Sequence, residues 1–231
     1  MILTRDRLTS MIDYALVKPI HTTADLERAA KVARNNRIGV LCVLPVMVGK
    51  ACELLKGSNV KVCSVVDFPL GSSPTGVRVF QAERAVEDGA HELDAVMSLP
   101  LFKSELYGRA RADMKAVVEA AKRRGLELGR SVVVKIIIET GYLTAEEIRL
   151  ASQLVEEAGA DYVKTCTGFG PRGAALKDVL IIRSATSRVK VKAAGGISTF
   201  AKAVEFIRAG AKRIGASRVL DILKGWRLVE V

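Results

Sequence analysis

The sequence predicts an α/β fold in which one (β/α)8 barrel spans residues 1–231 as a single domain. Short apolar, β-branched runs alternate with longer amphipathic stretches, a pattern typical of a parallel sheet with crossover helices. No linker, low-complexity tract or composition break divides the chain. An open, doubly wound sheet is the alternative, but eight alternating units in 231 residues fit a closed TIM barrel better, because such barrels commonly have about 200–250 residues.

The apolar runs predict the strands. Two of them, VKVCSVV and VVVKIII, are nearly continuously apolar, as expected for strands buried on both faces. In chain order, the expected strands are Met11–Tyr14, Ile38–Leu44, Val60–Val66, Glu92–Met97, Val132–Ile138, Asp161–Lys164, Val189–Ala193 and Arg213–Gly215.

The amphipathic stretches predict the helices between these strands. Gly-Ala pairs at Gly89, Gly159 and Gly210 indicate helix C-termini, where glycine adopts a left-handed conformation. The expected helices are Ala24–Asn35, Val46–Lys56, Thr75–Asp88, Ser104–Arg124, Ala145–Ala158, Leu176–Ala185, Phe200–Ala209 and Ser217–Leu223.

Composition argues against several classes of protein. With 49% apolar and 26% charged residues, the chain has the make-up of a soluble globular protein. No apolar run approaches the about 18–20 residues that cross a bilayer, and the N-terminus mixes acidic with basic residues, unlike a signal peptide. The four cysteines show no CxxC spacing, so we expect buried, reduced thiols in a cytoplasmic protein rather than a zinc site or a disulfide framework.

The formal net charge of +11 lies almost entirely after residue 100. A nucleic-acid surface is one explanation. However, acidic residues are interspersed among the basic ones, aromatic residues make up only 5%, and no nucleic-acid-binding motif is present. A positive field also speeds the approach of a small anion. We therefore expect a small anionic substrate, no nucleic-acid partner and no membrane.

Charged side chains at the carboxyl ends of the strands indicate where the chemistry lies, because barrels build their active sites there. Lys164 and Lys192 end two consecutive apolar strands, and Asp94 ends an earlier one. One such lysine is often a rim residue or half of an ion pair, but two on neighbouring strands favour chemistry. A second ammonium in an apolar mouth lowers the pKa of an amine, as Schiff-base enzymes require, and a carboxylate can transfer protons.

Glycine-rich loops after the last two strands predict a phosphate site, since exposed backbone N–H groups at helix N-termini bind phosphate. The residues GGIS follow the seventh strand, GAS follows the eighth, and a further glycine loop follows the sixth. Together with polar residues at other strand ends, the candidate substrate- or phosphate-binding residues are Asp13, Cys42, Lys135, Thr167, Gly168, Gly195, Gly196, Ser198, Gly215 and Ser217.

Both lysines lie in distinctive segments, DYVKTCTGF (Asp161–Phe169) and VKAAGGI (Val191–Ile197). These resemble the Schiff-base segment and the second-lysine segment of the deoxyribose-phosphate aldolases. Further similar segments are IDYALVKP, FPLG, ELD, KIIIETG and IGAS, so the resemblance runs from about Asp13 to Ser217.

The resemblance implies the reversible cleavage of 2-deoxy-D-ribose 5-phosphate to D-glyceraldehyde 3-phosphate and acetaldehyde. It implies that Lys164 forms the imine, that Asp94 and Lys192 move protons, and that no cofactor is needed. It also implies a homo-oligomer, a dimer or a tetramer.

The chain departs from the family pattern at several positions. Cys166 stands where serine is usual, Tyr14 where histidine or leucine is common, and Leu44 where asparagine is frequent; the tail lacks a terminal tyrosine. Many members carry arginine after the Gly-Gly-Ile and a second serine after the Gly-x-Ser, whereas this chain has Ser198 and Arg218. We therefore expect Arg218 to contact the phosphate from the neighbouring loop.

Other functions stay open at this point. Another lysine-dependent aldolase or a transaldolase would keep the imine and change the donor. A phosphate-binding barrel without catalysis would bind phosphate and form no imine. A metal-dependent aldolase is disfavoured, because His21 and His91 are the only histidines and neither has a partner at ligand spacing.

Overall fold

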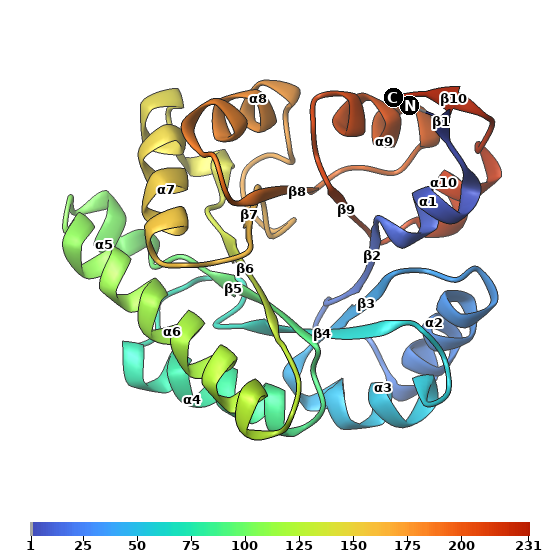
Figure 1. The fold of residues 1–231 in the computed structure, drawn as a ribbon, viewed down its shortest axis with the longest axis horizontal. Helices are drawn as coiled ribbons and strands as arrows, with labels where there is room; N and C mark the ends of the chain where they lie inside the picture. Colours follow the sequence, from blue (N-terminus) through green and yellow to red (C-terminus); the bar gives the residue numbers. More distant parts are fainter. Residues whose placement is uncertain (1) are drawn as a thin grey trace.

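The computed structural model describes residues 2–231 and contains a closed barrel of eight parallel strands surrounded by helices (Figure 1). The strands follow one another round the barrel in chain order, and β9 closes on β2. The predicted (β/α)8 fold is therefore confirmed. The barrel strands are β2 (Ile12–Leu16), β3 (Val40–Val43), β4 (Lys61–Val66), β5 (Glu92–Val96), β6 (Val133–Ile137), β7 (Tyr162–Lys164), β8 (Lys190–Ala194) and β9 (Arg213–Ala216).

A helix follows each barrel strand and packs on the outside of the barrel (Figure 1). Capping boxes start α2 and α7. The side chains of Thr22 and Thr144 each accept a hydrogen bond from the backbone N–H three residues on, and the acidic side chain at that position accepts one from the backbone N–H of the threonine. The covering helices are α2 (Thr23–Asn35), α3 (Val48–Leu55), α4 (Thr75–Glu87), α6 (Tyr107–Glu127), α7 (Ala145–Glu157), α8 (Leu176–Ala185), α9 (Phe200–Arg208) and α10 (Val219–Lys224).

Short elements that the hydrophobic pattern did not predict lie at the two ends of the chain. The helix α1 (Arg5–Ser10) precedes β2. The strand β1 (Ile2–Leu3) pairs antiparallel with β10 (Val229–Glu230), so the termini lie side by side (Figure 1). The tail runs along α9, where Arg208 donates to the carbonyl of Glu230.

Three expected helices begin later than the sequence suggested, one of them Ser217–Leu223, which begins at Val219 as α10. The expected helix Ser104–Arg124 starts three residues late: an unpredicted short helix, α5 (Leu99–Lys103), precedes it, Glu105 adopts a left-handed φ of 58°, and α6 starts at Tyr107. The expected helix Val46–Lys56 opens as a 3-10 turn, η1 (Pro45–Met47), before α3. A second such turn, η2 (Thr140–Tyr142), follows β6.

The barrel strands separate an outer core from the barrel interior. Alternate strand residues face opposite sides, so Leu41 packs outward against the helices while its neighbours point inward. On β3 and β4 the inward residues form a small apolar cluster of Val40, Cys42, Cys63 and Val65. The other strands place ionisable side chains in the interior, and these make the site described below.

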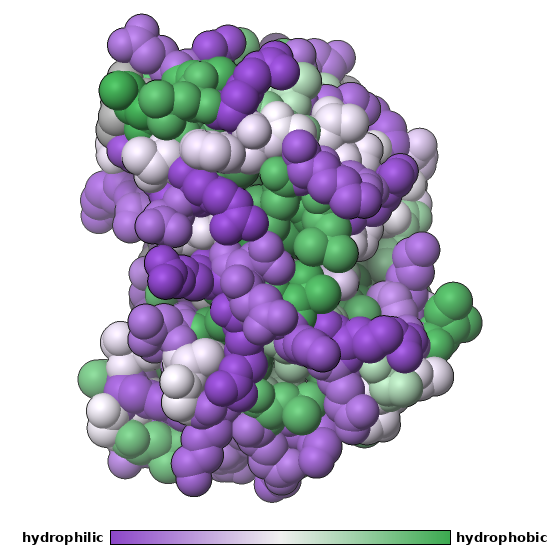
Figure 2. All heavy atoms as spheres, turned by 90° about the vertical axis from the view of Figure 1, so that its right-hand side faces the viewer, coloured by the Kyte–Doolittle hydropathy of each residue, from purple (hydrophilic) through white to green (hydrophobic). Residues whose placement is uncertain are grey.

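The face that carries α1, α2 and α10 is covered mostly by hydrophilic side chains, with apolar groups exposed between them (Figure 2). Among the helices of residues 2–231, none is both long and apolar enough to cross a membrane.

Candidate active site

A cavity of about 700 Å³ opens at the carboxyl ends of the barrel strands. Its walls come from the ends of β2, β7, β8 and β9 and from the loops that follow them. This is the place where barrel enzymes bind their substrates. The predicted site residues that line it are Cys42, Lys164, Thr167, Gly168, Lys192, Gly195, Gly196, Ser198, Gly215, Ser217 and Arg218.

Two lysines and one carboxylate form a trio at the floor of the cavity. Lys164 and Lys192 occupy paired positions on β7 and β8, so their side chains project to the same face. Asp94 reaches between them from β5: its Oδ2 accepts hydrogen bonds from Lys164 Nζ at 2.7 Å and from Lys192 Nζ at 2.6 Å. The trio thus combines a cavity-facing amine, a proton acceptor and a fixed positive charge.

Below the trio, a second layer of charged groups fills the barrel. Lys135 Nζ lies 3.0 Å from Asp94 Oδ1 and 2.5 Å from Glu92 Oε2. Glu92 in turn lies 3.0 Å from Arg213. Lys135 is fully buried and does not line the cavity, so it acts on a bound molecule through its carboxylate partners, whereas the sequence suggested a direct contact.

Asp13 belongs to the same lower layer. Its Oδ2 lies 2.5 Å from Lys192 Nζ, and its Oδ1 accepts a hydrogen bond from Arg213 at 2.8 Å. Asp13 is fully buried and absent from the cavity wall, so it fixes Lys192 rather than facing a ligand. Four basic side chains therefore meet three carboxylates in this network.

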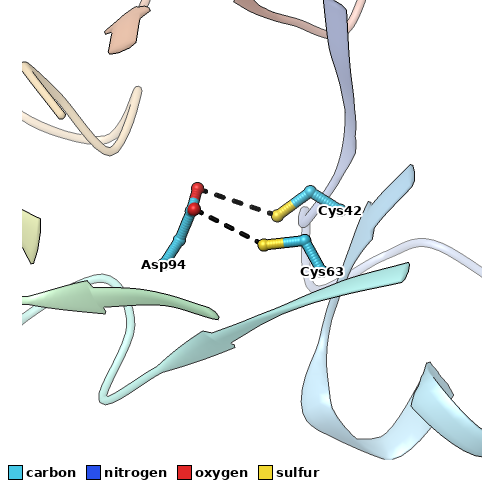
Figure 3. Close-up of side chains that lie close together, drawn as sticks. All are labelled: Cys42, Cys63 and Asp94. Atoms are coloured by element: carbon cyan, nitrogen blue, oxygen red, sulfur yellow. Dashed lines mark hydrogen bonds between the residues drawn. The ribbon is translucent and has the colours of Figure 1, made fainter. Parts of the chain in front are cut away.

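Two thiols flank the carboxylate of Asp94 (Figure 3). Cys63 Sγ lies 3.4 Å from Oδ1 and Cys42 Sγ lies 3.9 Å from Oδ2. The sulfur and carboxylate atoms lie within 4.8 Å of one another, a spacing that could hold a metal ion. However, Asp94 is already paired with three ammonium groups, which would repel a cation.

The loop after β7 is held by a residue outside the predicted set. Glu139 lies two residues after the end of β6, in a left-handed conformation with φ 50°. Its carboxylate accepts hydrogen bonds from the backbone N–H of Thr167, at 3.0 Å, and from the Thr167 hydroxyl. The Thr167 side chain is therefore engaged with Glu139 where it lines the cavity.

Glycine is needed in the two predicted phosphate loops for two different structural reasons. Gly195 and Gly196 adopt φ values of 104° and 75°, which side-chain-bearing residues rarely adopt. At Gly215 the reason is space, because a Cβ there would lie 2.7 Å from Cβ of Ala194 and 3.3 Å from Cε of Lys192. Both loops therefore bring backbone close to the cavity, as a phosphate site requires.

Arg218 lines the cavity, but its placement differs from the expected first helical turn. The helix α10 begins at Val219, and Arg218 precedes it with non-helical angles, φ −102° and ψ 53°. Its side chain is 68% exposed and its Nε donates to Asp221 at 2.7 Å. A bound phosphate would therefore compete with Asp221 for this guanidinium.

The buried charges set each other's protonation. Burial alone would raise the pKa of Asp94, but the ammonium groups of Lys135, Lys164 and Lys192 hold it well below its usual range. Burial alone would lower the pKa of Lys192, but Asp13 and Asp94 raise it. At neutral pH the site therefore holds Asp94 as a carboxylate and Lys192 as an ammonium.

These shifts predict an acid-sensitive fold. The pKa of Asp13 is lowered, because its positive neighbours outweigh the effect of burial. A lowered folded-state pKa stabilises the protein above the unfolded value of about 4, and this contribution is lost as pH falls through the folded value. We expect Asp13→Asn to be less stable by about 3–5 kcal/mol at neutral pH and to lose less on acidification. Urea unfolding of the wild type and of Asp13→Asn at pH 7 and pH 3 checks this. An equal fall in the free energy of unfolding between the two pH values in both proteins would contradict it.

Comparisons with known proteins place the chain in a family. A family profile described as DeoC/LacD family aldolase matches residues 1–225. The chain belongs to this aldolase family. The aldolase is 44% identical over 220 residues to the deoxyribose-phosphate aldolase of Carboxydothermus hydrogenoformans, with 95% of each chain covered. It is 43% identical over 226 residues to that of Thermococcus kodakarensis, covering 96% of this chain and 98% of the relative.

A solved structure agrees with the family assignment. The aldolase superimposes with a TM-score of 0.87 on the tetrameric deoxyribose phosphate aldolase from Aeropyrum pernix. The two share 32% sequence identity over 96% of this chain and 91% of that one. The chain is therefore an enzyme of the lyase class, as the motifs predicted.

Proposed function

We propose that this aldolase reversibly cleaves 2-deoxy-D-ribose 5-phosphate to D-glyceraldehyde 3-phosphate and acetaldehyde through an imine on Lys164. The observation that carries the proposal is the trio at the cavity floor, where a cavity-facing amine shares a buried carboxylate with a second lysine. The names of the relatives support the substrate class.

Imine formation needs one proton acceptor and one proton donor. Lys164 must be a neutral amine to attack the C1 aldehyde, so one proton leaves its ammonium group for water before the attack. The N–C bond then forms, the aldehyde oxygen takes up a proton, and a second proton leaves the nitrogen to give the carbinolamine. Asp94 can accept it, directly or through water, because its Oδ2 lies 2.7 Å away. Lys192, held as an ammonium by Asp13 and Asp94, can protonate the hydroxyl that leaves as water.

Carbon–carbon cleavage then follows from the imine. The C3 hydroxyl gives its proton to Asp94 or to a water molecule, and the C2–C3 bond breaks to release D-glyceraldehyde 3-phosphate. The electron pair of that bond moves into the protonated imine to give an enamine. Protonation of the enamine at C2 regenerates the imine, which water hydrolyses to acetaldehyde. The imine is the electron sink, so the reaction requires no cofactor.

The substrate phosphate would lie against the loops after β8 and β9. One side of this region is lined by Gly195, Gly196 and Ser198, and the other side is lined by Gly215, Ser217 and Arg218. Closely approaching backbone N–H groups bind phosphate oxygens, and a guanidinium adds a charge-assisted hydrogen bond.

Arg218→Ala should weaken binding of deoxyribose 5-phosphate by about ten-fold, near the lower end for a charge-assisted contact, because the phosphate must displace Asp221. Cleavage of unphosphorylated deoxyribose should hardly change. Asp221→Asn is the matched control, since it frees Arg218 and should bind the phosphorylated sugar at least as tightly as wild type. Equal losses on both sugars would show that Arg218 does not contact the phosphate.

Reductive trapping tests the proposed function most directly. Incubation with acetaldehyde and borohydride should convert the imine to a stable ethyl adduct, and peptide mapping should place it on Lys164. The same incubation with dihydroxyacetone phosphate separates the proposal from another lysine-dependent aldolase or a transaldolase. Trapping with this donor and not with acetaldehyde would overturn the assigned substrate.

The oligomeric state of the aldolase and the cellular role of its reaction are part of the same proposal. We expect a homo-oligomer, in keeping with the tetrameric relative from Aeropyrum pernix. We also expect the reaction to serve deoxyribonucleotide catabolism in the cytoplasm. Mass determination in solution tests the first expectation.

A further inference from the structure

Cys42 and Cys63 form a pair of buried thiols inside the barrel, and the proposed reaction makes no bond to either. They occupy paired positions on β3 and β4, so both side chains project to the same face. Both sulfurs point toward the carboxylate of Asp94 (Figure 3). The two sulfurs and a carboxylate oxygen lie within 4.8 Å of one another.

The strand geometry permits a bond between the two sulfurs. Neighbouring strands lie about 4.8 Å apart, and disulfide-bonded residues have Cα atoms about 4.4–6.8 Å apart. Cys42 and Cys63 are direct register partners, so the bond requires rotation of the side chains and no separation of the strands.

The two thiols differ in access and in acidity. Cys42 lines the cavity, whereas Cys63 is fully buried behind it. A hydrogen bond with Cys63 lowers the pKa of Cys42 against the effects of burial and of the Asp94 carboxylate, and the charges of Lys192 and Lys164 lower it further. Burial raises the pKa of Cys63. A molecule that enters the cavity therefore meets the more reactive sulfur first, with a protonated partner behind it.

The surrounding charge favours a thiolate over a bound metal ion. A cation between the two sulfurs and Asp94 would have to displace Lys135, Lys164 and Lys192 from the carboxylate. Two of these ammonium groups, those of Lys192 and Lys164, lower the pKa of Cys42 and so stabilise a negative sulfur there.

We propose that Cys42 and Cys63 form a reversible disulfide when the aldolase meets hydrogen peroxide, and that the disulfide lowers its activity. The Cys42 thiolate attacks the peroxide: an S–O bond forms, the O–O bond breaks, and hydroxide leaves and takes up a proton as water. The Cys63 sulfur then attacks the resulting sulfenic acid. The S–S bond forms, the S–O bond breaks, and the departing hydroxide takes the Cys63 proton. Two thiols are oxidised and one peroxide is reduced to water.

The disulfide would act on catalysis through Asp94. In the reduced protein, Cys63 donates to Oδ1 at 3.4 Å and Cys42 to Oδ2 at 3.9 Å, and Lys135 donates to Cys63 Sγ at 3.6 Å. Oxidation removes both S–H donors from the carboxylate that positions Lys164 and Lys192. We expect turnover to fall by at least about ten-fold, because the loss of one hydrogen bond to a charged group has about this effect and two are lost here. This consequence rests on the proposed function; formation of the disulfide does not.

Peptide mapping tests the formation of the disulfide, and an activity assay on the same samples tests its effect on turnover. Trypsin places the four cysteines on four different peptides, because Lys50, Lys56 and Lys61 separate Cys42 from Cys63 and Cys166 lies far along the chain. After limited hydrogen peroxide treatment and alkylation of free thiols under denaturing conditions, the peptides of Cys42 and Cys63 should be joined. Activity should fall with the joined fraction and return with dithiothreitol.

Two variants sharpen the test. In Cys63→Ser the partner thiol is missing, so peroxide should drive Cys42 on to sulfinic acid and the loss should resist dithiothreitol. Cys52→Ser alters a thiol on the outer helix α3 and should respond to peroxide as wild type does.

Sulfinic acid on Cys42 of the wild type beside a free Cys63, or a bond from either residue to Cys166, would overturn the disulfide. A joined pair with unchanged turnover would overturn its effect on activity. Because the bond is read by mass, the disulfide is tested even if the substrate assigned above is wrong.

Discussion

Lys164→Arg should lose turnover by about 10⁴-fold or more while the barrel stays folded. Arginine keeps the positive charge beside Asp94 and much of the side-chain volume, but its guanidinium remains protonated and forms no imine. Loss of a covalent nucleophile leaves only the contribution of binding and of the remaining polar groups. The release of acetaldehyde from deoxyribose 5-phosphate measures the effect.

A neighbouring lysine provides the matched control. Lys190 lies on β8 at the far end from the cavity and is exposed, with its Nζ over the ring of Tyr162. Lys190→Arg should keep both turnover and trapping by borohydride. An unfolding curve and a far-ultraviolet spectrum like those of wild type establish that Lys164→Arg is folded. A trapped adduct on Lys192 or Lys135 in the wild type would show that the nucleophile is misassigned.

The barrel could be predicted because strands buried on both faces have a plain signature. Runs such as VVVKIII have little alternation and are followed by longer amphipathic stretches. The boundaries near residue 104 could not be predicted in the same way. They depend on a left-handed Glu105, and no hydrophobic pattern marks a residue that takes positive φ. The β1–β10 pair was not predicted, because strands of two residues are too short to show a periodic hydrophobic pattern.

The trio at the cavity floor could be predicted from the sequence, because ionisable residues interrupt apolar strands. Lys164, Lys192 and Asp94 stand out for that reason, and the structure brings all three together. A usable signal also existed for Glu92, which lies two residues before Asp94 and therefore on the same face.

Other members of the network could not be read from the sequence. Arg213 begins a strand and resembles an ordinary polar strand end, yet it reaches Asp13, which lies 200 residues away in the chain. Cys63 resembles a small apolar core residue, and its pairing with Cys42 follows only from the register of β3 and β4. Long-range register, rather than local pattern, decides such contacts.

Asp94→Asn should lower kcat by about 10²–10⁴-fold, the range for loss of a positioned proton acceptor. The amide keeps the shape of the side chain but cannot accept the proton of Lys164, and it leaves three ammonium groups without their shared negative charge. Stability should fall as well, by up to about 3–5 kcal/mol, because buried charges then lack a partner.

Glu92→Gln separates these two effects. Glu92 is as buried as Asp94 and pairs with Lys135 and Arg213, but no pair links it to Lys164 or Lys192. We therefore expect a comparable loss of unfolding free energy with kcat within about ten-fold of wild type, since the proton acceptor is still in place. Both variants need kcat, KM and a urea unfolding curve at the same pH. Equal losses of kcat in the two variants would mean that Asp94 acts only by keeping the charged layers together, and that the proton of Lys164 goes to water or to another group.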